Sequence, residues 1–437
     1  MKTVNYACLF SVCSSALLVW LIGFFGTAKQ LSLRISTNLP TQAPSPDSPL
    51  LDSLLRATPV LRKVATNAAY ELQVIYTQID RDRQNQPRFT THTYHLDPRR
   101  YFNPASLVKL PVAALTLEKL RALQVSPDAI MTTGRAYRCQ TPVPFAAQAD
   151  PDRRTTPANY IRRMLLVSDN HAYNRLYELL GQRPLNERLT QLGYPDARIT
   201  RRFAPCDTAA NRHTNPITLL TPQRDTLYKQ PAQLNAQPYR SPLGRIAKGR
   251  AYRSGGQLIR RPYDFTTANQ LSLPVVTDLL RRLLFPASVP VAQRLALAPA
   301  DYALLRTSLH ATPHGSGFRP LQPPAYFDAY KKYLYYGRDP QTLADSTLRI
   351  YNVVGMSHGF LADVAYFADQ AQQSEFLLSA VLYINADGII NDGAYEYESV
   401  GLPFLAALGR QIRRYEAQRP RQFRPNLTEF FAPEAKR

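Results

Sequence analysis

Apolar positions from Leu51 to Ala65 recur at spacings of three and four residues, which predicts a helix there. Polar and apolar residues then alternate over Glu71–Ile79 and Phe89–His95, which predicts two strands joined by the polar turn 80–87. Helical spacing returns further along the chain, over 106–123, 156–167 and from there through Leu180. A helix, two strands and a helical region therefore form the first half.

The second half returns to strands. A helical stretch is predicted over Leu273–Leu284, followed by three strands over Arg349–Val354, Asp363–Ala368 and Glu375–Asn385. An amphipathic helix over Phe404–Gln418 closes the pattern. No internal repeat is present, so the order of elements is that of one enzyme-sized α and β domain.

The N-terminus indicates export. Lys2 precedes an uncharged stretch whose apolar part is Leu9–Phe25, followed by the small residues Gly26-Thr27-Ala28. We expect 1–28 to be either a signal peptide cleaved near Ala28 or an uncleaved membrane anchor. Either places the body in the periplasm or outside the cell, and an uncleaved anchor would attach it to the inner membrane. Residues 29–50, with four prolines in 36–49, read as a tether, and the domain is expected over 51–437.

Composition limits the partners. The chain has 437 residues and a formal charge of +21 from 53 Lys and Arg, only ten of them Lys. These are scattered without long basic runs, so we expect no nucleic-acid partner. Once a signal is removed, Cys139 and Cys206 remain, either as a disulfide in an oxidising compartment or as two separate thiols.

Two short motifs carry candidate chemistry. Ser106-Leu-Val-Lys109 places a hydroxyl and an amine on one face of a first helical turn, where the amine can accept the serine proton. Ser168-Asp169-Asn170 follows in the turn between two predicted helices. There a serine can relay a proton and an asparagine amide can hold a substrate amide, while Asp169 fits a helix N-cap. The pair is more specific than either motif alone.

Together these motifs resemble those of the penicillin-recognising serine hydrolases, most closely the class A β-lactamase-like group in its extended Bacteroidota form. The resemblance implies an α+β fold, an antiparallel sheet flanked by helices with an all-helical lobe and an inserted region at about 222–349. It implies that Ser106 is the acylated nucleophile, Lys109 its base, Ser168 the proton relay and Asn170 a substrate ligand. The substrate would be a β-lactam or a peptidoglycan-type peptide, with no cofactor and no metal.

The third motif of that family, Lys-Thr-Gly, is largely lost. In register it is Val353-Val354-Gly355, before an expected hairpin over Gly355–Asp363. The resemblance implies an oxyanion hole from the backbone N–H groups of Ser106 and Met356. The family's lysine there binds the substrate carboxylate, which Val353 cannot do. A second register over Ser357-His358-Gly359 would let a protonated His358 bind an anion.

The deacylating glutamate of class A β-lactamases is also missing. Aligning the loop 200–211 puts Ala204 in its place, and the nearby Asp207 is read as a turn or cap residue rather than a base. The resemblance therefore implies slow release of an acyl-enzyme. A non-catalytic or very slow penicillin-binding or cell-wall-binding protein on the same fold is the alternative function.

Two other chemistries fit less well. Gly355-Met-Ser357-His-Gly359 matches the Gly-x-Ser-x-Gly nucleophile elbow, which needs a helix after it and a histidine later, and no histidine follows His358. The seven histidines show no spacing suited to a metal site. The sequence leaves the natural substrate and the oligomeric state open.

Overall fold

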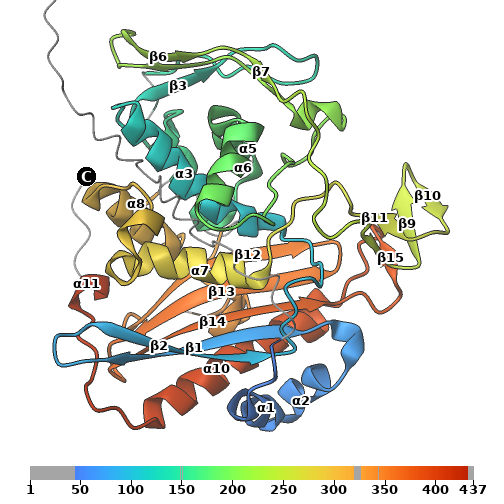
Figure 1. Ribbon diagram of the computed structural model, residues 1–437, viewed down its shortest axis with the longest axis vertical. Helices are drawn as coiled ribbons and strands as arrows, with labels where there is room; N and C mark the ends of the chain where they lie inside the picture. Colours follow the sequence, from blue (N-terminus) through green and yellow to red (C-terminus); the bar gives the residue numbers. More distant parts are fainter. Residues whose placement is uncertain (1–44, 148, 150, 319–325, 343, 432–437) are drawn as a thin grey trace, which may run out of the picture. The chain divides into compact units, whose positions relative to one another are not determined.

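The structure is a computed structural model that describes residues 45–147, 149, 151–318, 326–342 and 344–431. The segment predicted as signal or anchor, and most of the tether, lie outside these residues. The centre is a five-stranded antiparallel sheet in the order β12-β13-β14-β1-β2 (Figure 1). The strands are β1 Gln73–Arg81, β2 Pro87–Tyr94, β12 Leu348–Ser357, β13 Phe360–Asp369 and β14 Ser374–Tyr383.

The sheet joins the two ends of the chain, because β1 pairs antiparallel with β14. Its strands β1, β12, β13 and β14 are largely buried, whereas the edge strand β2 is partly exposed. One face packs with the N-terminal and C-terminal helices α1, α2 and α10 (Figure 1). Those helices are α1 Pro49–Arg56, α2 Pro59–Ala65 and α10 Leu402–Gln418.

The prediction of a single helix over Leu51–Ala65 is wrong, because the structure has two helices there, α1 and α2, with a short non-helical segment between them. Thr58 caps the second helix with its hydroxyl, and Pro59 occupies its first position. A proline interior to one long helix would lose a hydrogen bond and clash with the preceding turn. The apolar spacing survives the break because both helices bury their apolar residues in the same core.

The other face of the sheet carries the helical lobe. Helix α7, which occupies the predicted residues Leu273–Leu284, packs across β13 and β14, and the lobe lies beyond it (Figure 1). The remaining helices are α3 Lys109–Ala122, α4 Pro157–Val167, α5 Asn170–Leu180, α6 Gln182–Gln191, α8 Pro299–His310, α9 Tyr333–Tyr336 and α11 Thr428–Phe431. The large apolar core between lobe and sheet includes α7, so the 222–349 stretch contributes to the main domain.

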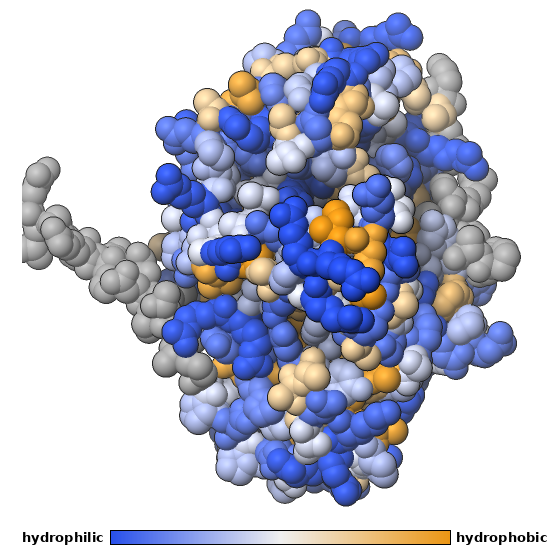
Figure 2. All heavy atoms as spheres, turned by 90° about the vertical axis from the view of Figure 1, so that its right-hand side faces the viewer, coloured by the Kyte–Doolittle hydropathy of each residue, from blue (hydrophilic) through white to orange (hydrophobic). Residues whose placement is uncertain are grey.

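The other strands are short, and most of them lie between α6 and α7. They are β3 Ile130–Thr133, β4 His213–Thr214, β5 Ile217–Leu220, β6 Thr226–Gln230, β7 Gln233–Leu234, β8 Ala247–Lys248, β9 Ala251–Ser254, β10 Gln257–Ile259 and β11 Tyr263–Asp264, with β15 Ile389–Ile390 joining β9. The β9–β10 hairpin projects at the side turned to the viewer in Figure 2, where the surface is largely hydrophilic with small apolar patches.

The first described residues run beside the sheet. The backbone N–H groups of Ser45 and Ser48 donate to the carbonyls of Leu96 and Thr93. The folded body thus begins a few residues earlier than Leu51. Within the described residues, no helix combines the length and apolar character needed to span a membrane.

Candidate active site

Ser106 lies in a 3₁₀ turn, Ala105–Val108, that leads into α3. Ala105 before it has a φ of 44°, a conformation that costs a non-glycine residue energy, and its N–H donates to the Asn103 side chain at 2.8 Å. The turn presents Ser106 at a half-buried position while Lys109 points into the buried space below. The local backbone is thus held in an uncommon conformation directly before the candidate nucleophile.

The Lys109 ammonium is the centre of the site. Its Nζ lies 2.8 Å from Ser106 Oγ, 2.8 Å from Ser168 Oγ and 2.7 Å from Asn170 Oδ1. It also lies 2.5 Å from the Ser168 carbonyl. The carbonyl and the amide oxygen can only accept hydrogen bonds, so they take two N–H groups of the amine. In the neutral amine this leaves one lone pair, which can accept a proton from either of the two hydroxyls, one at a time.

The environment favours that neutral amine. Burial lowers the pKa of Lys109 to about 7, the Asp169 carboxylate acts in the opposite direction, and the nearby ammonium of Lys331 lowers the pKa further. A base with a pKa near the working pH is half neutral there and can accept a proton from a hydroxyl. The phenyl ring of Phe203 also covers Nζ, with 4.6 Å from nitrogen to ring centroid.

Ser168 and Asn170 reach the amine because α4 ends and α5 begins between them. Ser168 closes α4 in the left-handed conformation with a φ of 63°, which turns the chain sharply. Asp169 caps α5, its carboxylate accepting from the N–H of Ala172 at 3.0 Å and from Arg163. The structure therefore brings the four side chains of the two motifs together.

Strand β12 forms the opposite side of the site. A Cβ built on Gly355 would lie 2.7 Å from the Pro104 carbonyl oxygen, so only glycine permits this approach of the strand to the nucleophile turn. Met356 follows at the sheet edge, since β12 is the outermost strand. Val353 is buried in the core between sheet and lobe. The glycine that survives from the third motif is the residue that touches the nucleophile turn.

The expected hairpin over Gly355–Asp363 is shorter than predicted. Strand β12 continues through Ser357, β13 begins at Phe360, and the turn is His358-Gly359 alone. Both turn residues have positive φ, 56° and 83°, the conformation of tight two-residue hairpins. Because a strand follows instead of a helix, the segment does not have the geometry of a nucleophile elbow.

His358 lies among aromatic side chains. Its ring lies beside Tyr263 and Phe265, with centroids 5.8 Å and 5.4 Å away, and its Nδ1 contacts Ser357 Oγ. Burial, aided by the charge of Arg201, lowers the pKa of His358 to about 4. This environment disfavours a protonated His358 near neutral pH, and anion binding by His358 stays a prediction; the imidazole packs against the aromatic residues around β11.

Phe203, not Ala204, is the loop residue that faces the amine. The Asn174 side chain clamps Phe203 from α5, accepting from its N–H at 2.8 Å and donating to its carbonyl at 2.9 Å. Ala204 follows with a φ of 47°. The sequence alignment of the loop missed this because it could not foresee which side chain the clamp turns inward. An aromatic ring therefore occupies the space beside Lys109.

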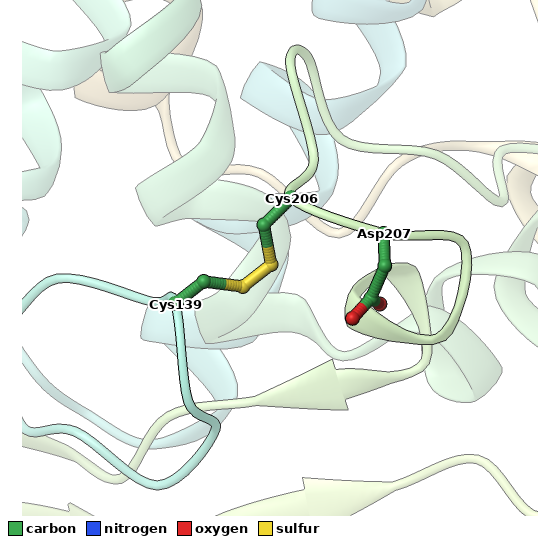
Figure 3. A group of neighbouring side chains, drawn as sticks. All are labelled: Cys139, Cys206 and Asp207. Carbon is green, nitrogen blue, oxygen red and sulfur yellow. A yellow bond between two sulfur atoms is a disulfide. The ribbon is translucent and has the colours of Figure 1, made fainter.

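Cys139 and Cys206 form a disulfide, with Cα atoms 6.1 Å apart. Figure 3 shows the joined sulfurs with Asp207 beside them. Although these three residues lie close enough to suggest a metal site, the bonded sulfurs offer no thiolate. Asp207 caps the turn before Ala210 and pairs with Arg138, so it has the structural role expected of it. The disulfide anchors the loop that carries Phe203.

Sequence reasoning missed Phe203 and also Lys331, whose charge acts on Lys109. Phe203 stood in a loop already singled out, but its orientation depends on Asn174, one helical turn after Asn170. Lys331 and Lys332 are adjacent lysines in a chain that has few, which is a signal the sequence did contain. Their place just before β12 became evident only from the fold.

Part of the chain resembles a known protein family. Residues 57–228, which include both motifs, match the family model described as "Beta-lactamase enzyme family". No curated protein matches the chain. Similar solved structures include a β-lactamase from Sphaerobacter thermophilus, 12% identical over 85% of this chain and 98% of that chain with a TM-score of 0.44. Another, from Xanthomonas campestris pv. campestris, is 14% identical over 84% and 97% with a TM-score of 0.45.

A third similar structure is a reconstructed class A β-lactamase, the last common ancestor of Gram-negative bacteria, 16% identical over 84% of this chain and 99% of that chain with a TM-score of 0.44. These values carry no conclusion about activity. The family match rests on the stretch that holds Ser106, Lys109, Ser168 and Asn170. The structure combines an antiparallel sheet with a helical lobe, which is an α+β arrangement, and residues 57–228 are similar to the β-lactamase enzyme family.

Proposed function

We propose that the protein is an exported serine hydrolase that forms an acyl-enzyme on Ser106 with a β-lactam or a peptidoglycan-type amide. The observation that carries this proposal is the arrangement around Lys109, whose amine touches both serine hydroxyls while two fixed acceptors hold its N–H groups. A buried lysine beside an unused serine would only cost stability.

The reaction proceeds in defined proton transfers. Ser106 Oγ attacks the carbonyl carbon while its proton passes to Lys109 Nζ, and the C–N bond then breaks. Ser168, hydrogen-bonded to the same Nζ at 2.8 Å, relays the proton to the departing nitrogen. Backbone N–H groups of Ser106 and Met356 receive the developing oxyanion. Asn170, which holds the amine in place, is also available to the substrate amide.

Release of the acyl group is the weak step of this scheme. Hydrolysis of the ester needs a base for water, and Phe203 covers Lys109 where a carboxylate would have to lie. Asp169 is engaged in a helix cap and an ion pair, and Asp207 pairs with Arg138. These observations also favour a second candidate function, a penicillin-binding protein that acylates and scarcely turns over.

Export is part of the proposal. The apolar N-terminal stretch supports it, and so does the disulfide, since disulfides persist in oxidising compartments. Cell fractionation tests it: we expect the protein in the envelope or medium with Cys139 and Cys206 resistant to alkylation until a reductant is added. Cytoplasmic protein with two reactive thiols would contradict export.

Covalent labelling tests the chemistry. Incubation with benzylpenicillin followed by intact mass spectrometry should show one adduct of the intact penicillin mass, mapped to Ser106. The S106A variant should show none, and Ser357→Ala should label normally. A persistent adduct in S106A would refute the assignment, whereas an adduct that decays within seconds would favour a hydrolase over a slow penicillin-binding protein.

A further inference from the structure

Two consecutive buried lysines lie outside the mechanism described so far. Lys331 and Lys332 are 4% and 3% exposed. Burying a charge is costly unless it finds partners. Lys332 finds three acceptors for its three N–H groups, at 2.8 Å to the Leu309 carbonyl, 2.6 Å to the Ile350 carbonyl and 2.8 Å to Asn352 Oδ1. Its placement is explained by strand β12 and the end of α8, which together supply these acceptors.

Lys331 is different. Its Nζ donates to the Asn352 carbonyl at 3.0 Å, and the described residues supply no further acceptor for its other two N–H groups. The Asp363 carboxylate acts electrostatically on Lys331, but the hydrogen bonds of its oxygens come from the Asn352 amide and the Leu334 N–H, both at 2.9 Å, instead of an ammonium. The Lys331 side chain therefore holds unused donors.

Those donors lie along the edge of the sheet that leads to the nucleophile. The carbonyls of Ile350 and Asn352 point away from β13, toward the two lysines. In an antiparallel ladder every second residue points its backbone N–H and C=O to the same side. The backbone groups of Val354 and Met356 therefore also point to this free edge. Two residues along a strand span about 6.6 Å. Lys331 thus stands at the edge beside Val354, with Met356 one step further.

The chain before Lys331 lies against the other wall of the site. Phe318, Tyr326 and Tyr330 pack with Leu166 and Val167, the residues directly before Ser168. Lys331 is therefore set between the free edge of β12 and the end of α4. The electrostatic effect of Lys331 on Lys109 also indicates that Lys331 lies near the reacting groups.

We propose that Lys331 is the carboxylate-binding residue of this active site, and that its two spare N–H groups receive the anionic group of the acylating substrate. The cation comes from the segment before β12, and Val353 on the strand itself is an apolar core residue. This inference rests on the proposed acylation of Ser106, and it goes beyond it by assigning a substrate with a carboxylate close to the scissile amide.

A matched pair of probes tests the assignment. Benzylpenicillin and its methyl ester differ only in the carboxylate, and acylation of Ser106 by each is followed by intact mass at pH 7.5. The readout is the ratio of the two acylation rates, because a changed Lys109 affects both probes alike. In the wild type we expect the acid to react about tenfold to a hundredfold faster, the effect of one charge-assisted hydrogen bond. In Lys331→Met the ratio should fall to about one.

Lys119→Met is the matched control. Lys119 is another buried lysine, on α3, and it binds the Leu179 carbonyl and Gln230 away from the free edge of β12. Its loss should leave the ratio at the wild-type value. A wild-type ratio near one, or an unchanged ratio in Lys331→Met, would overturn the role of Lys331 while leaving acylation intact. Absence of any adduct in the wild type with both probes would overturn the proposed function as well.

Discussion

The two sides of the site are built in different ways. On the helical side, Ser106, Lys109, Ser168 and Asn170 act through their side chains and come from two motifs of four and three residues. On the strand side, Gly355 acts by having no side chain and Met356 by a backbone N–H. The chemistry of the first is encoded in residue type; that of the second is encoded in the path of the main chain.

The comparison teaches where substitutions are tolerated. A strand can change its side chains and still present the same N–H groups, provided that the glycine at the contact point remains. An amine that must bind four oxygens has no such freedom. The charge that the strand lacks can come from another segment, here the one carrying Lys331, without disturbing the backbone geometry.

Adding a carboxylate to the helical side should change the chemistry most. We expect Phe203→Glu to speed hydrolysis of a preformed penicillin adduct by about 100-fold, because a general base then lies where the ring covers Lys109. Decay of the adduct by mass spectrometry measures deacylation separately from acylation. Ala204→Glu is the control and should have little effect. Faster deacylation in Ala204→Glu and little change in Phe203→Glu would show that Ala204 faces the site.

The acylation rate should depend on pH through Lys109. Since burial lowers its pKa to about 7, the amine is neutral above this pH and protonated below it. Acylation by an uncharged fluorophosphonate should therefore fall about tenfold for each pH unit below 7 and level off above. Lys119→Met should keep this acid limb. A profile that stays flat from pH 5 to 9 would exclude Lys109 as the base.

The strand side should be most sensitive at its glycine. In Gly355→Ala the added methyl lies 2.7 Å from the Pro104 oxygen, so strand or nucleophile turn must shift. We expect a loss of about 1–3 kcal/mol in the free energy of unfolding and acylation slower by about tenfold. Gly193→Ala, a glycine with φ of 94° and open space around it, should lose stability without slowing acylation. Equal acylation rates in both variants would show that the close approach of Gly355 to Pro104 does not contribute to acylation.

The disulfide should matter to stability and hardly to acylation. It joins positions 67 apart, and its loss in the C139S/C206S variant should cost about 2–4 kcal/mol in the free energy of unfolding. Acylation should change less than about threefold, because Asn174 still holds Phe203 and none of the hydrogen-bond partners of Lys109 belongs to the disulfide. Thermal unfolding with and without reductant, beside the labelling assay, measures both. A loss of labelling would make the disulfide part of the site.

Much of the fold was predictable, because long elements repeat their apolar positions. The strands, α7 and α10 are found at or within a few residues of the predicted ranges. The break before Pro59 and the two-residue turn at His358-Gly359 depend on single residues that a periodic pattern averages out. The four helical-side residues were found since their spacing is local. Phe203 and Lys331 were missed because a loop clamp and a packed irregular segment determine their directions.

The pairing of β1 with β14 has a consequence for how the protein is made. Residues 73–81 are buried on both faces of the sheet, yet their partner strand is some 300 positions later in the chain. Contacts so distant in sequence form slowly, after a large loss of chain entropy. Strand β1 can pair with β2 soon after both are made, but it gains its second neighbour only once residues 374–383 have been synthesised. The five-stranded sheet is therefore completed late in synthesis, after the helical lobe between β2 and β12 has been made.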